Sequence, residues 1–103
     1  WHIGVLWDLD PRAALPLIDM LRVDPALHVG DNEPYDGALY GDTLHDLCSA
    51  KGIAHALIEV RQDLIGDDKG VAEWALRLTP MLASLNLVSR IHEIQHFGSR
   101  AKP

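Results

Sequence analysis

The sequence contains a single cysteine and has a shortage of positive charge. Cys48 is the only Cys among 103 residues, so an internal disulfide is impossible and a stapled secreted scaffold is excluded. Nine Lys and Arg stand against 15 Asp and Glu, which gives a formal net charge of -6. Because nucleic-acid binders need clustered positive charge to meet phosphates, this balance argues against a nucleic-acid partner.

Long apolar runs and several catalytic motifs are also missing. No apolar stretch approaches the roughly 20 residues of a membrane span, and there is no leader with basic, apolar and small parts. There is no glycine-rich phosphate loop. None of the serines has the sequence surroundings of a nucleophile elbow; they are Ser49, Ser84, Ser89 and Ser99. We therefore expect a cytoplasmic protein without a membrane partner.

Strand-like and helix-like segments alternate along the chain, which is long enough for one domain. Strands are predicted at His2–Trp7, Leu27–Val29 and Ile53–Val60. Helices are predicted from Pro11 to about Arg22 after an Asp10 cap, and from a Thr43 cap to a stop at Gly52. A third is predicted from about Asp67 to Leu85, with a kink or division at Pro80. This order predicts an α/β fold with a parallel or mixed sheet and flanking helices.

Polar side chains gather where two of the predicted strands end. Glu59 and Arg61 follow the apolar part of the third strand, and the loop of residues 30–42 follows the second. In open α/β sheets, ligands bind outside the carboxyl ends of the strands. We therefore expect both polar clusters to lie at one edge of the sheet.

The Glu59 and Arg61 pair allows two interpretations. Residues two apart on a strand point to the same face, about 6.6 Å apart along the strand. In a strand covered on both faces, an ionised Glu is costly unless it is paired or bound to a ligand. The two residues then form either an ion pair with each other or a general base beside a substrate-binding Arg.

The loop sequence GDNEPYDG holds a second candidate cluster. Asp31, Asn32, Glu33 and Tyr35 crowd around Pro34, whose ring stiffens the turn. Such a run is often a solvated acidic loop. Alternatively, its Asn and Tyr side chains could orient a small polar ligand beside the strand end.

A third candidate is the sequence HEIQH, which matches the H-E-x-x-H pattern of zinc peptidases. On a helix, His92 and His96 would grip zinc while Glu93 activates water. No third ligand follows His96, and Gly98 makes a continued helix doubtful. No ligand spacing relates the remaining histidines, which are His2, His28, His45 and His55.

Three motifs together resemble a known enzyme family. WHIGVLWDLDPR, VGDNEPYDG and HALIEVRQDLI, in this order, resemble the C-terminal half of the N-formylglutamate amidohydrolases, over residues 1 to about 85. The resemblance implies part of a zinc-carboxypeptidase-like (phosphorylase/hydrolase-like) fold. It also implies hydrolysis of the amide of an N-formyl or N-acyl acidic amino acid, of the type found in histidine degradation.

The resemblance also implies roles for individual residues. It makes Glu59 the catalytic base, and it assigns substrate binding to Arg61, Asn32, Glu33 and Tyr35. The family's zinc ligands precede the segment that matches Trp1, so the expected cofactor, zinc, has no ligand here. A basic residue and a His often begin the helix after the loop, where this chain has His45, Asp46 and Leu47.

Residues 1–103 are then expected to be the C-terminal portion of one domain, inactive alone and prone to self-association through a truncated sheet edge. Two other functions stay open. One is a metallopeptidase that uses His92, Glu93 and His96, and the other is a non-catalytic α/β interaction domain.

Overall fold

Three short strands form the sheet at the centre of the fold. The computed structural model describes all 103 residues, with strands β1 (Ile3–Leu6), β2 (Val29–Asp31) and β3 (Leu57–Val60) in the order β2-β1-β3. β1 pairs with β2 in parallel and with β3 antiparallel. The sheet is therefore mixed, in agreement with the predicted α/β class.

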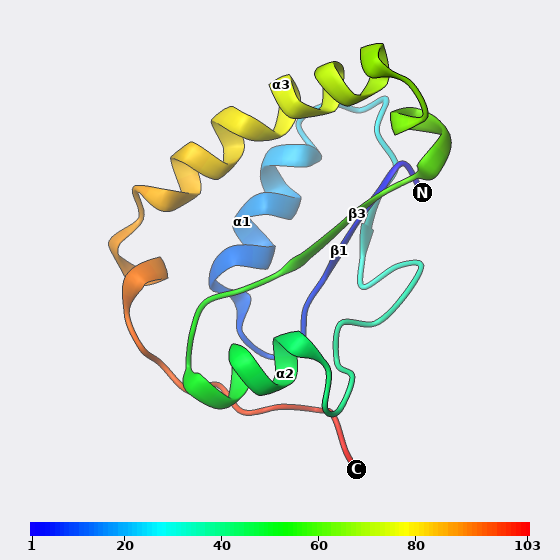
Figure 1. The fold of residues 1–103 in the computed structure, drawn as a ribbon. Coiled ribbons are helices and arrows are strands. Elements are labelled where there is room, and N and C mark those ends of the chain that lie inside the picture. Colours follow the sequence, from blue (N-terminus) through cyan, green and yellow to red (C-terminus); the bar gives the residue numbers. More distant parts are fainter.

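The helices lie on one face and at one end of this sheet. They are α1 (Pro11–Leu21), α2 (Thr43–Leu47) and α3 (Asp68–Asn86), with 3-10 turns at Ser49–Lys51, Gln62–Ile65 and Ser89–His92. Figure 1 shows α1 and α3 on the same side of the strands and α2 beyond the end of the sheet. None of the helices has the length and apolar character needed to cross a membrane.

The core lies between the sheet and α1, and Trp74 of α3 closes it. Alternate strand residues face inward, because successive side chains of a strand point to opposite faces. The buried apolar residues that form this cluster are Ile3, Val5, Ala14, Leu17, Ile18, Leu21, Val29 and Trp74. Ile58 and Val60 of β3 pack against the same cluster, so Glu59 between them belongs to the opposite face.

Several predicted boundaries need correction. β2 begins at Val29 and extends to Asp31, whereas the predicted strand ended at Val29. β3 covers only residues 57–60 of the predicted 53–60. The predicted helix at 43–52 divides into α2 and a 3-10 turn, and its cap is Asp42, whose Oδ1 accepts from His45 N at 2.8 Å. α3 continues through Pro80 without division, since one missing N–H is tolerated when the rest of the helix packs.

Two local predictions are confirmed. Asp10 caps α1 by accepting from Arg12 N at 3.1 Å, and Pro11 occupies the first helical turn. The stop at Gly52 is a left-handed residue with φ 71°, a conformation that glycine adopts without steric cost.

Buried charges tie the C-terminal segment to the first helix. The Arg12 guanidinium pairs with Asp10 at 2.7 Å and also donates to three backbone carbonyls, those of Gly52, Arg90 and Glu93. Both charged side chains are at most 5% exposed. The hydrogen bond with Asp10 raises the pKa of Arg12 further, so the guanidinium stays charged inside the protein.

A second clamp joins the C-terminal segment to the loop after β2. Arg100 donates to both carboxylate oxygens of Asp36, at 2.9 and 2.8 Å, and its backbone N–H donates to the buried Asp8. The hydrogen bonds from Arg100 lower the pKa of Asp36 to about 2, from 3.8. The ionised form of Asp36 is therefore the one that favours folding.

Asp36→Asn is expected to remove part of the acid sensitivity of the fold. The folded pKa is the lower one, so the stabilisation is complete above pH 3.8 and is lost as the pH falls toward 2. Both side chains are substantially exposed, which limits the loss at pH 7 to below about 1 kcal/mol. Urea unfolding of both proteins between pH 2 and 7 tests this. The two curves should converge near pH 2, and a constant difference down to pH 2 would contradict the assignment.

Candidate functional site

The expected meeting of both polar clusters at one edge of the sheet is wrong. α2 stays at the carboxyl end of β1, so the chain enters β3 from that end and runs back antiparallel to β1, with Leu57 opposite Leu6. The carboxyl end of β3 therefore lies beside the amino end of β1. Glu59 and Arg61 sit at the end of the sheet opposite to the end from which the loop of residues 30–42 departs.

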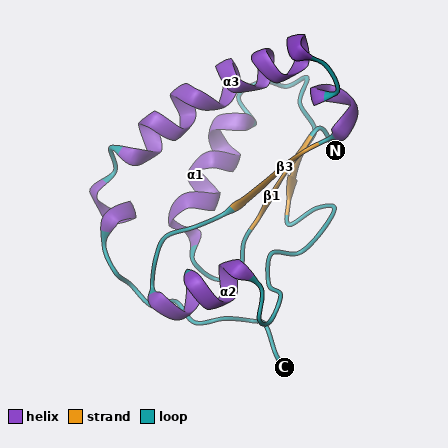
Figure 2. Ribbon diagram, in the orientation of Figure 1, coloured by secondary structure: helices purple, strands orange, loops and turns teal.

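The loop nevertheless reaches Glu59, because it folds back over the face of the sheet. Gly4, Gly30 and Glu59 form one row across the three strands, on the face away from α1 and α3. The Glu33 carbonyl lies directly over the two glycines, and a Cβ built on either one would fall within 2.4 Å of the Glu33 oxygen. Figure 2 shows the loop segment beside the strands, on the side without helices. Two glycines thus make room for the loop to approach Glu59.

Gly4→Ala is expected to displace this loop and to destabilise the protein by about 1–3 kcal/mol. The added methyl would lie 2.4 Å from a backbone oxygen, which a side-chain rotation cannot relieve. The matched control is Gly66→Ala, where the nearest atoms lie at 3.7 Å and φ is -78°, so no loss is expected. Thermal unfolding of both variants tests this, and equal melting temperatures would contradict the packing of the loop on Gly4.

A small hollow of about 120 Å³ results from this approach. The residues that line it are Trp1, Gly4, Pro34, Glu59, Val60 and Arg61. The same hollow is therefore lined by Glu59, Arg61 and Pro34 of the loop motif. The hollow holds about four water molecules by volume, which fits the end of a small polar ligand.

The two charged residues of the hollow have different partners. Glu59 is half-buried and makes no side-chain hydrogen bond or ion pair within the chain. Arg61 donates from Nε to Asp63 Oδ1 at 2.6 Å and from a terminal nitrogen to Oδ2 at 3.1 Å. This contact raises the pKa of Arg61 and lowers the pKa of Asp63. Glu59 and Arg61 thus form no ion pair with each other.

The three loop residues named as substrate contacts lie in different surroundings. Asn32 holds the loop, because its Oδ1 accepts from Trp7 N at 2.8 Å and from Gly37 N at 3.1 Å, and its φ is 52°. Glu33 and Tyr35 have exposed side chains without hydrogen bonds. A signal for the structural role of Asn32 was present in the sequence, since Asn is favoured in the left-handed conformation.

The HEIQH sequence does not form a helix. Ser89–His92 forms a 3-10 turn, and residues 93–97 after it have no regular structure. His92 Nε2 contacts the Asn86 carbonyl at 2.7 Å. His92 and His96 therefore lack the one-turn helical spacing that the H-E-x-x-H pattern requires.

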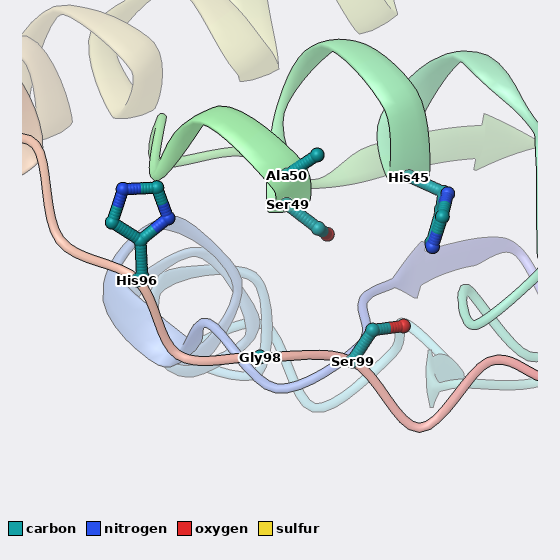
Figure 3. A pocket seen from close by; sticks show the side chains of 6 residues that line it. All are labelled: His45, Ser49, Ala50, His96, Gly98 and Ser99. Carbon is teal, nitrogen blue, oxygen red and sulfur yellow. The ribbon is translucent and has the colours of Figure 1, made fainter.

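A second hollow, of about 250 Å³, lies between the α2 region and the C-terminal segment. Sequence reasoning did not find it, because its walls come from residues about 50 positions apart. Figure 3 shows its lining residues, which are His45, Ser49, Ala50, His96, Gly98 and Ser99. Burial raises the pKa of the Cys48 thiol, which precedes Ser49 in the sequence, and this favours the packed, uncharged form.

The fold and the two hollows define a small α/β domain with a three-stranded mixed sheet and polar sites on its open face and at its end. The structure contains no group of three or more His, Cys, Asp or Glu side chains that could hold a metal ion. No family model, curated protein or solved structure matches the chain.

Proposed function

We propose that this chain carries the base and part of the substrate pocket of a hydrolase that resembles the N-formylglutamate amidohydrolases. The observation that carries the proposal is the shared hollow of Glu59, Arg61 and Pro34. These residues come from two of the three motifs on which the resemblance rests. The substrate would be the amide of an N-formyl or N-acyl acidic amino acid.

Glu59 suits the role of general base because it is half-buried and free of partners. In the proposed reaction a Glu59 oxygen takes a proton from the attacking water, whose oxygen bonds to the formyl carbon. The C–N bond then breaks, and Glu59 returns the proton to the leaving nitrogen. The products are formate and the free amino acid, and the carboxylate is regenerated.

Arg61 suits the role of carboxylate contact. A guanidinium presents a planar fork of donors that can bind a carboxylate with two hydrogen bonds. Asp63 already occupies this fork in the free chain, and both side chains are largely exposed. A substrate carboxylate would therefore replace the Asp63 contact rather than fill an empty site.

Zinc, which the resemblance implies, does not fit the residues of this chain. The carboxylates and imidazoles are dispersed, and no three of them converge. In the proposal the ligands belong to a segment before Trp1, as in the family that the motifs resemble. Calorimetric titration of the 103-residue chain with zinc should then give no stoichiometric tight site.

N-formyl-L-glutamate is expected to bind this chain weakly at the hollow. Arg61→Ala should lower the affinity for this ligand at least about tenfold, because the substitution removes a bidentate charged contact. Amide NMR titration measures both effects, with shifts expected at Gly4 and at residues 59–61. Arg77→Ala is the matched control, because it removes a half-buried Arg that lies outside the hollow and pairs with Asp24 at 3.4 Å. This variant should bind like the original chain.

Formamide separates the carboxylate contact from simple filling of the hollow. It has the amide of the substrate but no carboxylate, so its binding should not depend on Arg61. Equal affinity of N-formyl-L-glutamate for the original chain and for Arg61→Ala would contradict the assigned role of Arg61. Shifts confined to residues outside the hollow would contradict the site itself.

A further inference from the structure

The second hollow adjoins a serine and histidine pair that the proposed hydrolase site does not use. Ser49 Oγ lies 3.1 Å from His55 Nε2, and His55 Nδ1 lies 2.7 Å from the Ile53 carbonyl oxygen. His55 is 8% exposed, and Ser49 is half-buried. His55 is the first residue of the HALIEVRQDLI motif, but the resemblance assigns no role to His55 or to Ser49.

The hydrogen bonds fix the tautomer of the neutral His55. A carbonyl oxygen only accepts, so Nδ1 must carry the proton that it donates to Ile53. Nε2 is then the unprotonated nitrogen, and it accepts from the Ser49 hydroxyl. A base held in one tautomer against a hydroxyl is the arrangement that activates a serine, with the Ile53 carbonyl as the orienting group.

The backbone between the two residues is a tight, closed turn. Ile53 N donates to the Cys48 carbonyl at 3.1 Å, and Gly52 takes a left-handed φ of 71°. Arg12 and Gln95 both donate to the Gly52 carbonyl, at 3.1 and 2.9 Å. The pair is therefore held in place by bonds to the core and to the C-terminal segment.

The hydroxyl of Ser49 is accessible from the hollow. In Figure 3 its side chain points into the space between the turn and the segment at Gly98 and Ser99, and the His45 ring points into the same space. A volume of about 250 Å³ equals that of about eight waters, which fits a short acyl group better than a drug-sized ligand.

We propose that Ser49 and His55 form a nucleophilic dyad that accepts short acyl groups from esters. His55 Nε2 takes the hydroxyl proton as Ser49 Oγ bonds to the ester carbonyl carbon. The ester C–O bond breaks, and the leaving alcohol takes the proton from His55. Water then hydrolyses the acyl-serine with His55 again as the base, which releases the carboxylic acid and restores the dyad.

An alkyl fluorophosphonate tests the dyad directly on the 103-residue chain. The reagent phosphonylates an activated serine with loss of fluoride, and peptide mass spectrometry locates the adduct. We expect up to one adduct per chain, on Ser49. Absence of an adduct, or an adduct spread over several serines, would overturn the proposal.

Three variants separate nucleophile, base and background. Ser49→Ala should lose the adduct, and His55→Gln should slow labelling by about a hundredfold, since Gln hydrogen bonds but takes no proton. Ser89→Ala is the matched control, because Ser89 also begins a 3-10 turn and makes no side-chain hydrogen bond, and its labelling should be unchanged. Circular dichroism should show that each variant is folded.

4-Nitrophenyl acetate supplies a second readout that does not depend on a variant. The dyad predicts a burst of up to one equivalent of nitrophenolate and an acetyl group on Ser49. Turnover without acetyl-Ser49 would assign the reaction to other imidazoles that line the hollow, such as His45 and His96, and would overturn the dyad. Neither outcome bears on the Glu59 site.

Discussion

Glu59→Gln is expected to lower kcat for hydrolysis of N-formyl-L-glutamate by about a hundredfold or more, with KM little changed. Gln keeps the shape and hydrogen-bonding capacity of Glu but takes no proton from water. The loss therefore falls on the chemical step rather than on substrate binding. The proposal places the zinc ligands before Trp1, so the measurement is made on a form of the protein that contains such a segment and zinc, by assaying formate release at saturating substrate.

The same variant separates catalysis from stability. Glu59 makes no hydrogen bond or ion pair in this chain, so Glu59→Gln should melt at nearly the original temperature. Glu73→Gln, in the exposed Lys69–Glu73 pair of α3, is the matched control and should keep both kcat and the melting temperature. Normal turnover together with an early melt for Glu59→Gln would show that Glu59 is structural.

Arg12→Ala is expected to cause the largest loss of stability, about 3–5 kcal/mol. Removal of the guanidinium leaves the Asp10 carboxylate buried without a charge partner, and it leaves the carbonyls of Gly52, Arg90 and Glu93 without a shared donor. For a domain of this size the melting temperature should fall by at least about 12 °C. Urea unfolding at pH 7 gives the free energy directly.

Lys69→Ala is the control for this loss. Lys69 is 85% exposed and approaches Glu73 only to 4.0 Å, so its removal should change the free energy of unfolding by less than about 0.5 kcal/mol. Arg12→Lys refines the test, because a single ammonium keeps the charge but cannot reach Asp10 and three carbonyls together. If Arg12→Ala unfolded at the same urea concentration as Lys69→Ala, the buried ion pair would not hold the C-terminal segment.

The three mutational sets address separate parts of the molecule. Glu59 and Arg61 concern the hollow on the open face, Ser49 and His55 concern the hollow at the end of the sheet, and Arg12 concerns the joint between the core and the C-terminal segment. Because Arg12 also donates to Gly52, its removal should disturb the second hollow but leave the Gly4 row intact.

Local features of this protein were readable in the sequence. The start of α1 at Asp10 and Pro11 and the stop at Gly52 follow from preferences of single residues for a cap and for a left-handed φ. The alternation of apolar residues in β3 assigned Glu59 to the face opposite Ile58 and Val60. Such features depend on neighbours within a few positions, which the sequence displays directly.

The arrangement of the site was decided only by the tertiary structure. The period of a strand's apolar residues does not encode the strand's direction. β3 is antiparallel to β1 because α2 remains at the carboxyl end of β1, and this position of α2 is set by the tertiary structure. The register between the strands places Gly4, Gly30 and Glu59 in one row. This register therefore determines that the Glu33 carbonyl packs against Gly4 and Gly30. The second hollow pairs residues about 50 positions apart, and such contacts are fixed by packing rather than by any local pattern.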